Sequence, residues 1–120
     1  MEFNILNWFK DFENPLTFKT GETIFTEGTP GTVMFVVLDG KIDIQTGGNS
    51  LDVAGVGDII GEMALIDASS RSATAIALED CKLAPVDERQ FLYMVEHTPY
   101  FSLYVMKVLV ERLRRMDTVS

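Results

Sequence analysis

The residues best suited to bind a ligand lie within residues 57–75. Gly61 lets the backbone approach a bound group closely, and the next residue, Glu62, is a carboxylate that can accept a hydrogen bond from a hydroxyl. Residues 63–66 are long enough for one helical turn, whose free N–H groups attract an anion. Arg71 stands among short side chains with no acidic residue within three positions, and such an arginine can hold a phosphate through two parallel hydrogen bonds. The segment indicates a site for a phosphate and a sugar hydroxyl, although an ordinary loop between two strands is the simpler alternative.

Cysteine and histidine occur once each, as Cys81 and His97. One cysteine forms neither an internal disulfide nor a thiolate metal site, so Cys81 is either a redox sensor or, more simply, an apolar residue of a strand. His97 is expected at the end of a helix. The glycines at 55, 57 and 61 do not make a dinucleotide-binding motif, because three residues separate the last pair and no long helix follows. Without a serine–histidine–acid set, we expect a protein that is not an enzyme.

Short β-prone runs separated by glycine turns fill residues 16–86 and predict a sandwich or barrel. Asp39-Gly40 is a hairpin signal within this region. Residues 3–12 predict a short helix with an apolar face, to which Trp8 adds a large core side chain. Two further helices are expected over residues 87–97, where Asp87 and Gln90 suggest a capping box, and over residues 99–116. The fold class is therefore mainly β with flanking helices.

The 120 residues fit one compact domain, and 47% of them are hydrophobic, enough for a core. The net charge of −8 is opposite to that of a nucleic-acid-binding surface, so we expect no nucleic-acid partner. No apolar run approaches the roughly 20 residues that cross a bilayer, and the N-terminus lacks the basic and apolar regions of a signal peptide. We expect a cytoplasmic protein without a membrane partner.

The sequences Gly61-Glu62-Met63-Ala64-Leu65 and Arg71-Ser72-Ala73-Thr74 resemble, in order and spacing, the phosphate-binding cassette of cyclic-nucleotide-binding domains. The resemblance covers residues 16–116 and is closest to the sensor half of the bacterial catabolite-activator family. It implies an eight-stranded jelly-roll-like β-barrel over residues 16–86, with the cassette at 61–74. A single domain over residues 1–120 would include this barrel and the three helices.

The resemblance also implies roles for individual residues. Glu62 would accept a hydrogen bond from the ribose 2′-OH, and Arg71 would hold the cyclic phosphate. The hydroxyl of Ser72 and the backbone N–H of Ala64 would assist at the phosphate, and Arg112 would lie near the cassette glutamate. The complete set of expected ligand-binding residues is Gly61, Glu62, Met63, Ala64, Arg71, Ser72, Ala73 and Arg112.

Two positions depart from the family pattern. Ser70 replaces the proline that often precedes the arginine, which predicts a looser loop. The polar pair that contacts adenine in the activators falls at Met116-Asp117 here, which leaves recognition of the base open. Guanine-selective members usually carry threonine directly after the arginine, so Ser72 favours cAMP, with cGMP as the other possible ligand. No further cofactor is expected.

The last helix carries an apolar seam at Val105, Leu109, Leu113 and Met116, with Val108 beside it. Such a seam can pack on the barrel, form an interface with a dimer mate or an effector chain, or do both, because the helix is wide enough to serve two surfaces. The sequence therefore predicts a cyclic nucleotide sensor. The alternative is a degenerate domain of the same fold that does not bind nucleotide and acts as a structural or protein-interaction module. In the first case ligand occupancy would pass through the last helix to another chain.

Overall fold

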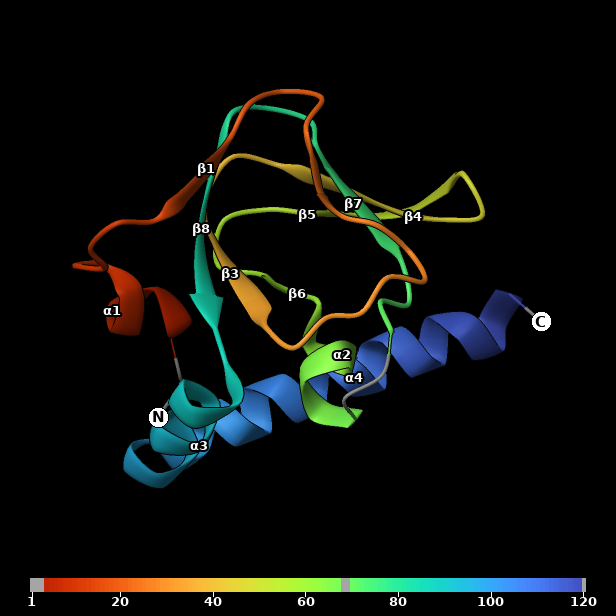
Figure 1. Ribbon diagram of the computed structural model, residues 1–120. Coiled ribbons are helices and arrows are strands. Elements are labelled where there is room, and N and C mark those ends of the chain that lie inside the picture. Colours follow the sequence, from red (N-terminus) through yellow and green to blue (C-terminus); the bar gives the residue numbers. More distant parts are fainter. Residues whose placement is uncertain (1–3, 68–69, 120) are drawn as a thin grey trace.

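The computed structural model describes residues 4–67 and 70–119, with side chains to residue 114. In this part, eight strands form two antiparallel sheets that face each other, and the helices lie on the outer side of one sheet (Figure 1). The helices are α1 (Ile5–Phe9), α2 (Glu62–Asp67), α3 (Glu88–His97) and α4 (Pro99–Val119). One sheet contains, in spatial order, β1 (Leu16–Phe18), β8 (Cys81–Val86), β3 (Met34–Asp39) and β6 (Ile59–Ile60). The other contains β2 (Thr23–Phe25), β7 (Thr74–Ala77), β4 (Ile42–Thr46) and β5 (Asn49–Ala54).

Strand β3 lies between two hydrophobic clusters and presents apolar side chains to both of them. Phe35 and Val37 pack between the two sheets, and Met34 and Val36 pack against the helices. A continuous apolar run is the pattern expected for a strand that is buried on both sides. The helix-side cluster reaches α4 through Phe101 and Val105 and reaches α2 through Leu65. The sheet carrying β6 is therefore fixed to α2 and α4, the two helices that hold the candidate site.

The predicted jelly-roll-like arrangement is confirmed, but the expected barrel is not closed. The named strands form two separate four-stranded ladders. One reason is the short β6, which pairs with β3 through only two residues before the chain turns into α2. The sequence analysis also missed β6, because two apolar residues are too few to show alternation.

The helices differ from expectation mainly at their ends. The capping box at the start of α3 is present: Asp87 accepts a hydrogen bond from the backbone N–H of Gln90, and the Gln90 side chain accepts one from the Asp87 N–H. Helix α4 begins at Pro99 as predicted and continues to Val119, beyond the expected end at residue 116.

Trp8 was wrongly placed in the core: it is 42% exposed, because the buried face of the short α1 consists of Ile5 and Phe9.

Tyr104 on α4 ties this helix to the turn before β6. Its hydroxyl donates to the carbonyl oxygen of Gly57 at 2.7 Å. Burial raises the pKa of Tyr104 to about 12, with smaller contributions from the nearby carboxylates of Asp58 and Glu111. Among the helices that the structure describes, none has the length and apolar character needed to cross a membrane.

Candidate functional site

The candidate site is built around the sharp turn from β6 into α2. Gly61 makes this turn with φ of +75°, a backbone conformation that favours glycine. A Cβ atom at this position would also lie 2.5 Å from Nη1 of Arg71. Ala64 and Leu65 anchor α2 in the interior, so the start of the helix is held beside the Arg71 side chain.

The backbone at Arg71 is fixed by the loop that follows β2. The Arg71 N–H donates to the carbonyl of Thr29 at 2.8 Å, and the Arg71 carbonyl accepts from the N–H of Gly28 at 2.8 Å. A β-bridge joins Pro30 to Ser70 next to these bonds. The expectation that serine before the arginine would loosen this segment is therefore not matched at Arg71, whose N–H and carbonyl are both bonded to the paired loop. Residues 68 and 69 of the same loop lie outside the described residues.

The Arg71 side chain points into the protein and is only 6% exposed. Its Nη1 donates to the carbonyl of Val33 at 2.7 Å and to that of Gly61 at 3.2 Å. The guanidinium carbon lies 4.5 Å from the centre of the Phe25 ring. Burial lowers the pKa of Arg71, because the charged form loses hydration. Within the described residues, no carboxylate forms an ion pair with this guanidinium, so its positive charge is balanced only by carbonyl dipoles and aromatic faces.

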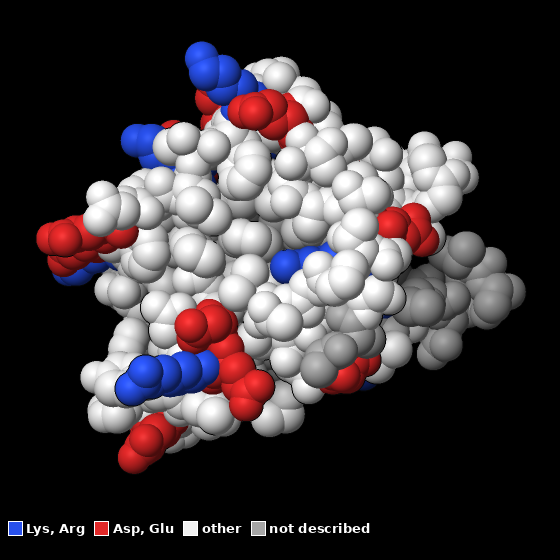
Figure 2. Space-filling view, viewed as in Figure 1, with Lys and Arg blue, Asp and Glu red and all other residues white. Residues whose placement is uncertain are grey.

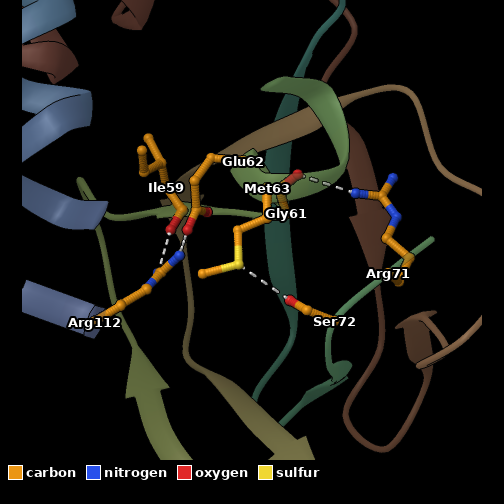
Figure 3. A network of polar contacts seen from close by, with 7 residues as sticks. All are labelled: Ile59, Gly61, Glu62, Met63, Arg71, Ser72 and Arg112. Atoms are coloured by element: carbon orange, nitrogen blue, oxygen red, sulfur yellow. Dashed lines mark hydrogen bonds and ion pairs between the residues drawn. The ribbon is translucent and has the colours of Figure 1, made fainter. Parts of the chain in front are cut away.

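Glu62 lies at the other side of the α2 start and is 1% exposed (Figure 3). Its Oε1 forms an ion pair with Nη1 of Arg112 on α4. Nη2 of Arg112 donates to the carbonyl of Ile59 at 2.9 Å. The second carboxylate oxygen, Oε2, is buried and has no hydrogen-bond partner in the described part of the chain. A buried acceptor without a donor is costly, so this oxygen suits a hydroxyl supplied by a ligand.

The structure brings most of the expected site residues together in a continuous series of contacts. Arg71 contacts Gly61, the next residue is Glu62, and Glu62 pairs with Arg112. Ser72 and Met63 lie between the two charged groups in Figure 3, with the Ser72 hydroxyl 3.6 Å from the Met63 sulfur. The remaining expected residues also lie on this segment: Ala64 is buried in the first turn of α2, and Ala73 is half-buried just before β7.

The sequence analysis missed three residues that surround the Arg71 guanidinium: Phe25, Gly31 and Val33. They come from the loop and strands before the cassette, and their types gave no signal of a binding role. Met116 and Asp117, which stand where the activators carry their adenine-contacting pair, have side chains outside the described residues. Figure 2 shows that the face seen in Figure 1 is largely uncharged near its middle, apart from a small area of Lys or Arg atoms.

The single cysteine and the single histidine both contact backbone carbonyls. Cys81 is buried in β8, where its thiol contacts the carbonyls of Glu79 and Lys41, and burial raises its pKa. A raised pKa leaves little reactive thiolate, which favours the interpretation of Cys81 as a packing residue. His97 ends α3, and its Nδ1 lies 2.9 Å from the carbonyl of Tyr93. The described residues contain no group of three or more His, Cys, Asp or Glu side chains that could hold a metal ion.

Comparisons with known proteins agree on one family. The family model for the cyclic nucleotide-binding domain matches residues 15–98. The chain is 28% identical to a CRP-like cAMP-activated global transcriptional regulator of Mycobacterium tuberculosis, over 86% of this chain and 48% of the relative. It is 32% identical to the cyclic AMP receptor protein of Thermus thermophilus, over 81% of this chain and 47% of the relative. The chain thus spans about half the length of these curated relatives.

A solved structure shows the same likeness in three dimensions. The crystal structure of the Thermus thermophilus catabolite activator protein has a TM-score of 0.81 and 28% sequence identity to this chain. The similarity covers 94% of this chain and 55% of that protein. The likeness therefore includes the sandwich together with the helices that flank it.

Proposed function

This chain belongs to the cyclic nucleotide-binding domain family, and from that premise we propose that it binds cAMP between Arg71 and Glu62. The observation that carries the proposal is the buried Arg71 guanidinium, which has no carboxylate partner among the described residues. Burying an unbalanced charge is unfavourable, and a singly charged phosphodiester would compensate it. Nη1 is bonded to two carbonyls, which leaves Nε and Nη2 as the donors for a phosphate.

The ribose would be recognised by Glu62. Its unpartnered Oε2 can accept a hydrogen bond from the 2′-OH. In this arrangement the anionic phosphate faces the positively charged Arg71. The ribose hydroxyl faces the Glu62 carboxylate, which accepts its hydrogen bond. The hydroxyl of Ser72 and the backbone N–H of Ala64, which lies in the first turn of α2 and has no intrahelical acceptor, would add donors to the phosphate.

The preference for adenine concerns the residue that follows Arg71. Ser72 stands where guanine-selective members usually carry threonine, and it lacks the threonine methyl group but keeps the hydroxyl, so we expect only a modest margin. Both curated relatives described above are named for cAMP. We therefore propose cAMP as the better ligand and cGMP as a weaker one.

Ligand occupancy would pass to another chain through α4. Arg112 joins this helix to the ribose-binding carboxylate, and the outer face of α4 carries exposed apolar side chains that a dimer mate or an effector could cover. We propose that the protein is a sensor and not an enzyme, so that it binds and releases the nucleotide without changing it chemically. Recovery of intact cAMP after prolonged incubation with the protein tests this part.

Calorimetric titration with cAMP and cGMP tests the binding site. We expect one cAMP per chain, weaker binding of cGMP, and a loss of about 2–5 kcal/mol in Arg71→Ala. Arg71→Lys should also weaken binding, but by less, because lysine keeps the positive charge and loses the bidentate hydrogen bonding of the guanidinium. Arg89→Ala, which removes an exposed arginine from α3, is the matched control. If wild-type protein shows neither heat nor thermal shift at millimolar cAMP, the domain has kept the fold and lost the ligand.

A further inference from the structure

The Arg71 guanidinium is held by contacts on its faces as well as by hydrogen bonds. Its carbon lies 4.5 Å from the Phe25 ring centre and 5.7 Å from that of Phe35. The two rings are nearly parallel, with an interplanar angle of 17° and centroids 6.1 Å apart. Phe25 is therefore the nearer aromatic surface for the cation, and the attraction between a guanidinium and a ring face increases where water is excluded.

Gly31 approaches the same guanidinium closely. A Cβ atom at Gly31 would lie 2.1 Å from Nε, 2.5 Å from Cζ and 2.8 Å from Nη2 of Arg71. The φ angle of Gly31 does not lie in the left-handed region, so its backbone can accept other residues. The glycine is needed for the space that the Arg71 side chain occupies, and alanine at this position would displace that side chain.

We propose that Phe25 and Gly31 are positioning residues that hold Arg71 in place for the phosphate. This inference rests on the proposed function. Val33 and Gly61 fix one nitrogen of the guanidinium, while Phe25 and Gly31 fix its plane. The donors on Nε and Nη2 make no hydrogen bond within the described residues. These two donors lie along one edge of the planar guanidinium and match two oxygens of a phosphodiester. Holding them in one position before binding reduces the ordering cost of the complex.

Two pairs of variants separate this role from general packing. Gly31→Ala is compared with Gly55→Ala, because Gly55 also lacks a left-handed φ and its added Cβ would meet no atom within 4 Å. Phe25→Leu is compared with Phe18→Leu, since both phenylalanines pack against the cluster between the sheets. In the described part of the chain, the guanidinium of Arg71 contacts the rings of Phe25 and Phe35 and not that of Phe18. Each protein is titrated with cAMP by calorimetry, and the Arg71 Nε–H resonance is recorded without ligand.

We expect Gly31→Ala to weaken cAMP binding about tenfold or more and Phe25→Leu to weaken it about three- to fivefold. The two control variants should stay within about twofold of wild type, the usual range for surface or conservative changes. In the ligand-free wild type, the ring face of Phe25 should shift the Arg71 Nε proton upfield. Phe25→Leu should remove that shift and Gly31→Ala should move the resonance, whereas both controls should leave it in place.

The outcomes separate this inference from the function on which it rests. If wild type binds cAMP and Gly31→Ala binds equally well or more tightly, the position of Arg71 is not required and the positioning role is overturned, while the binding function stands. An Arg71 resonance unaffected by Phe25→Leu overturns the role of Phe25. If wild type binds neither cAMP nor cGMP, the proposed function itself is overturned, and the positioning role with it.

Discussion

The buried carboxylate of Glu62 at the start of α2 pairs with the guanidinium of Arg112 on α4 (Figure 3). Arg112 also donates to the carbonyl of Ile59 in β6 at 2.9 Å. One side chain of α4 thus contacts both the strand and the helix that frame the candidate ribose site. Since Glu62 is 1% exposed, loss of Arg112 would leave a buried carboxylate without its charge partner.

Removing Arg112 should destabilise the fold. Arg112→Met leaves the Glu62 carboxylate buried without its charge partner, and we expect the free energy of unfolding to fall by about 3 kcal/mol, the low end for breaking a buried pair. The low end applies because the Arg112 side chain is 25% exposed to water. Urea denaturation at neutral pH measures the change, with Lys107→Met on the exposed side of α4 as control. Adding Glu62→Gln to Arg112→Met should restore part of the loss; equal stability of Arg112→Met and Lys107→Met would contradict the prediction.

Glu62 should make binding depend on the ribose 2′-OH. A hydrogen bond to a charged acceptor contributes about 1.5–3 kcal/mol, so 2′-deoxy-cAMP should bind wild type roughly tenfold or more weakly than cAMP. Glu62→Gln should reduce this ratio, because the amide oxygen is a weaker acceptor. Competition binding with the two nucleotides measures the ratio, and Glu88→Gln on the exposed start of α3 is the control. Equal affinities of wild type for both nucleotides would place the 2′-OH away from Glu62.

Tyr104 should make the domain lose stability at high pH. Its pKa is raised from 10 to about 12 in the folded protein, so the folded state retains a proton that the unfolded state releases. The contribution is complete below pH 10 and disappears as the pH rises towards 12. Urea midpoints at pH 8, 10 and 12 should therefore fall more steeply for wild type than for Tyr104→Phe. At pH 8 the variant should lose about 0.5–1.5 kcal/mol, the contribution of the hydrogen bond to Gly57; parallel pH profiles would show that Tyr104 ionises normally.

Much of the fold could be predicted from the sequence because the local signals agree with the packing. The short strands separated by glycine turns and the capping box at Asp87 have local causes and were correct. The order of glycine, glutamate and arginine in the cassette also located the segment that the structure arranges around Gly61, Glu62 and Arg71. These features depend on neighbours in the chain, which a sequence shows directly.

The errors concern contacts between distant segments. The seam expected at Val105, Leu109 and Leu113 is divided in the structure: Val105 is buried on the domain and Leu109 is partly buried there, while Leu113 is 56% exposed. A helix with apolar residues on two sides does not show which side meets its own sheet. The packing of Arg71 against Phe25 was likewise invisible, because it depends on the path of a loop before the cassette.

The outer side of α4 should mediate pairing of two chains. Its exposed apolar residues follow steps of three, four and three, a spacing typical of helix–helix contacts; they are Leu103, Met106, Val110 and Leu113. Light scattering should detect a dimer, and Leu113→Lys should shift it towards monomer. Leu92→Lys, at a comparably exposed leucine on α3, should leave the dimer intact. A wild type that is monomeric with and without cAMP would contradict the prediction.

Binding of cAMP should change the position or order of α4. When the ribose hydroxyl bonds to Glu62, the carboxylate shares its charge between the ligand and Arg112, so the contact that joins α4 to α2 differs between the two states. A ligand shifts a helix equilibrium only through such a difference in contacts.

Amide exchange over residues 100–114, with and without saturating cAMP, measures this change. We expect altered protection in wild type and in Lys107→Met, and a smaller change in Arg112→Met, because that variant lacks the connection to Glu62. The exchange experiment should be paired with light scattering, since an altered α4 would present or cover the apolar residues around Val110 and so change pairing. Equal protection in both states, together with an unchanged oligomeric state, would mean that α4 is a fixed support and that ligand occupancy is transmitted through another surface.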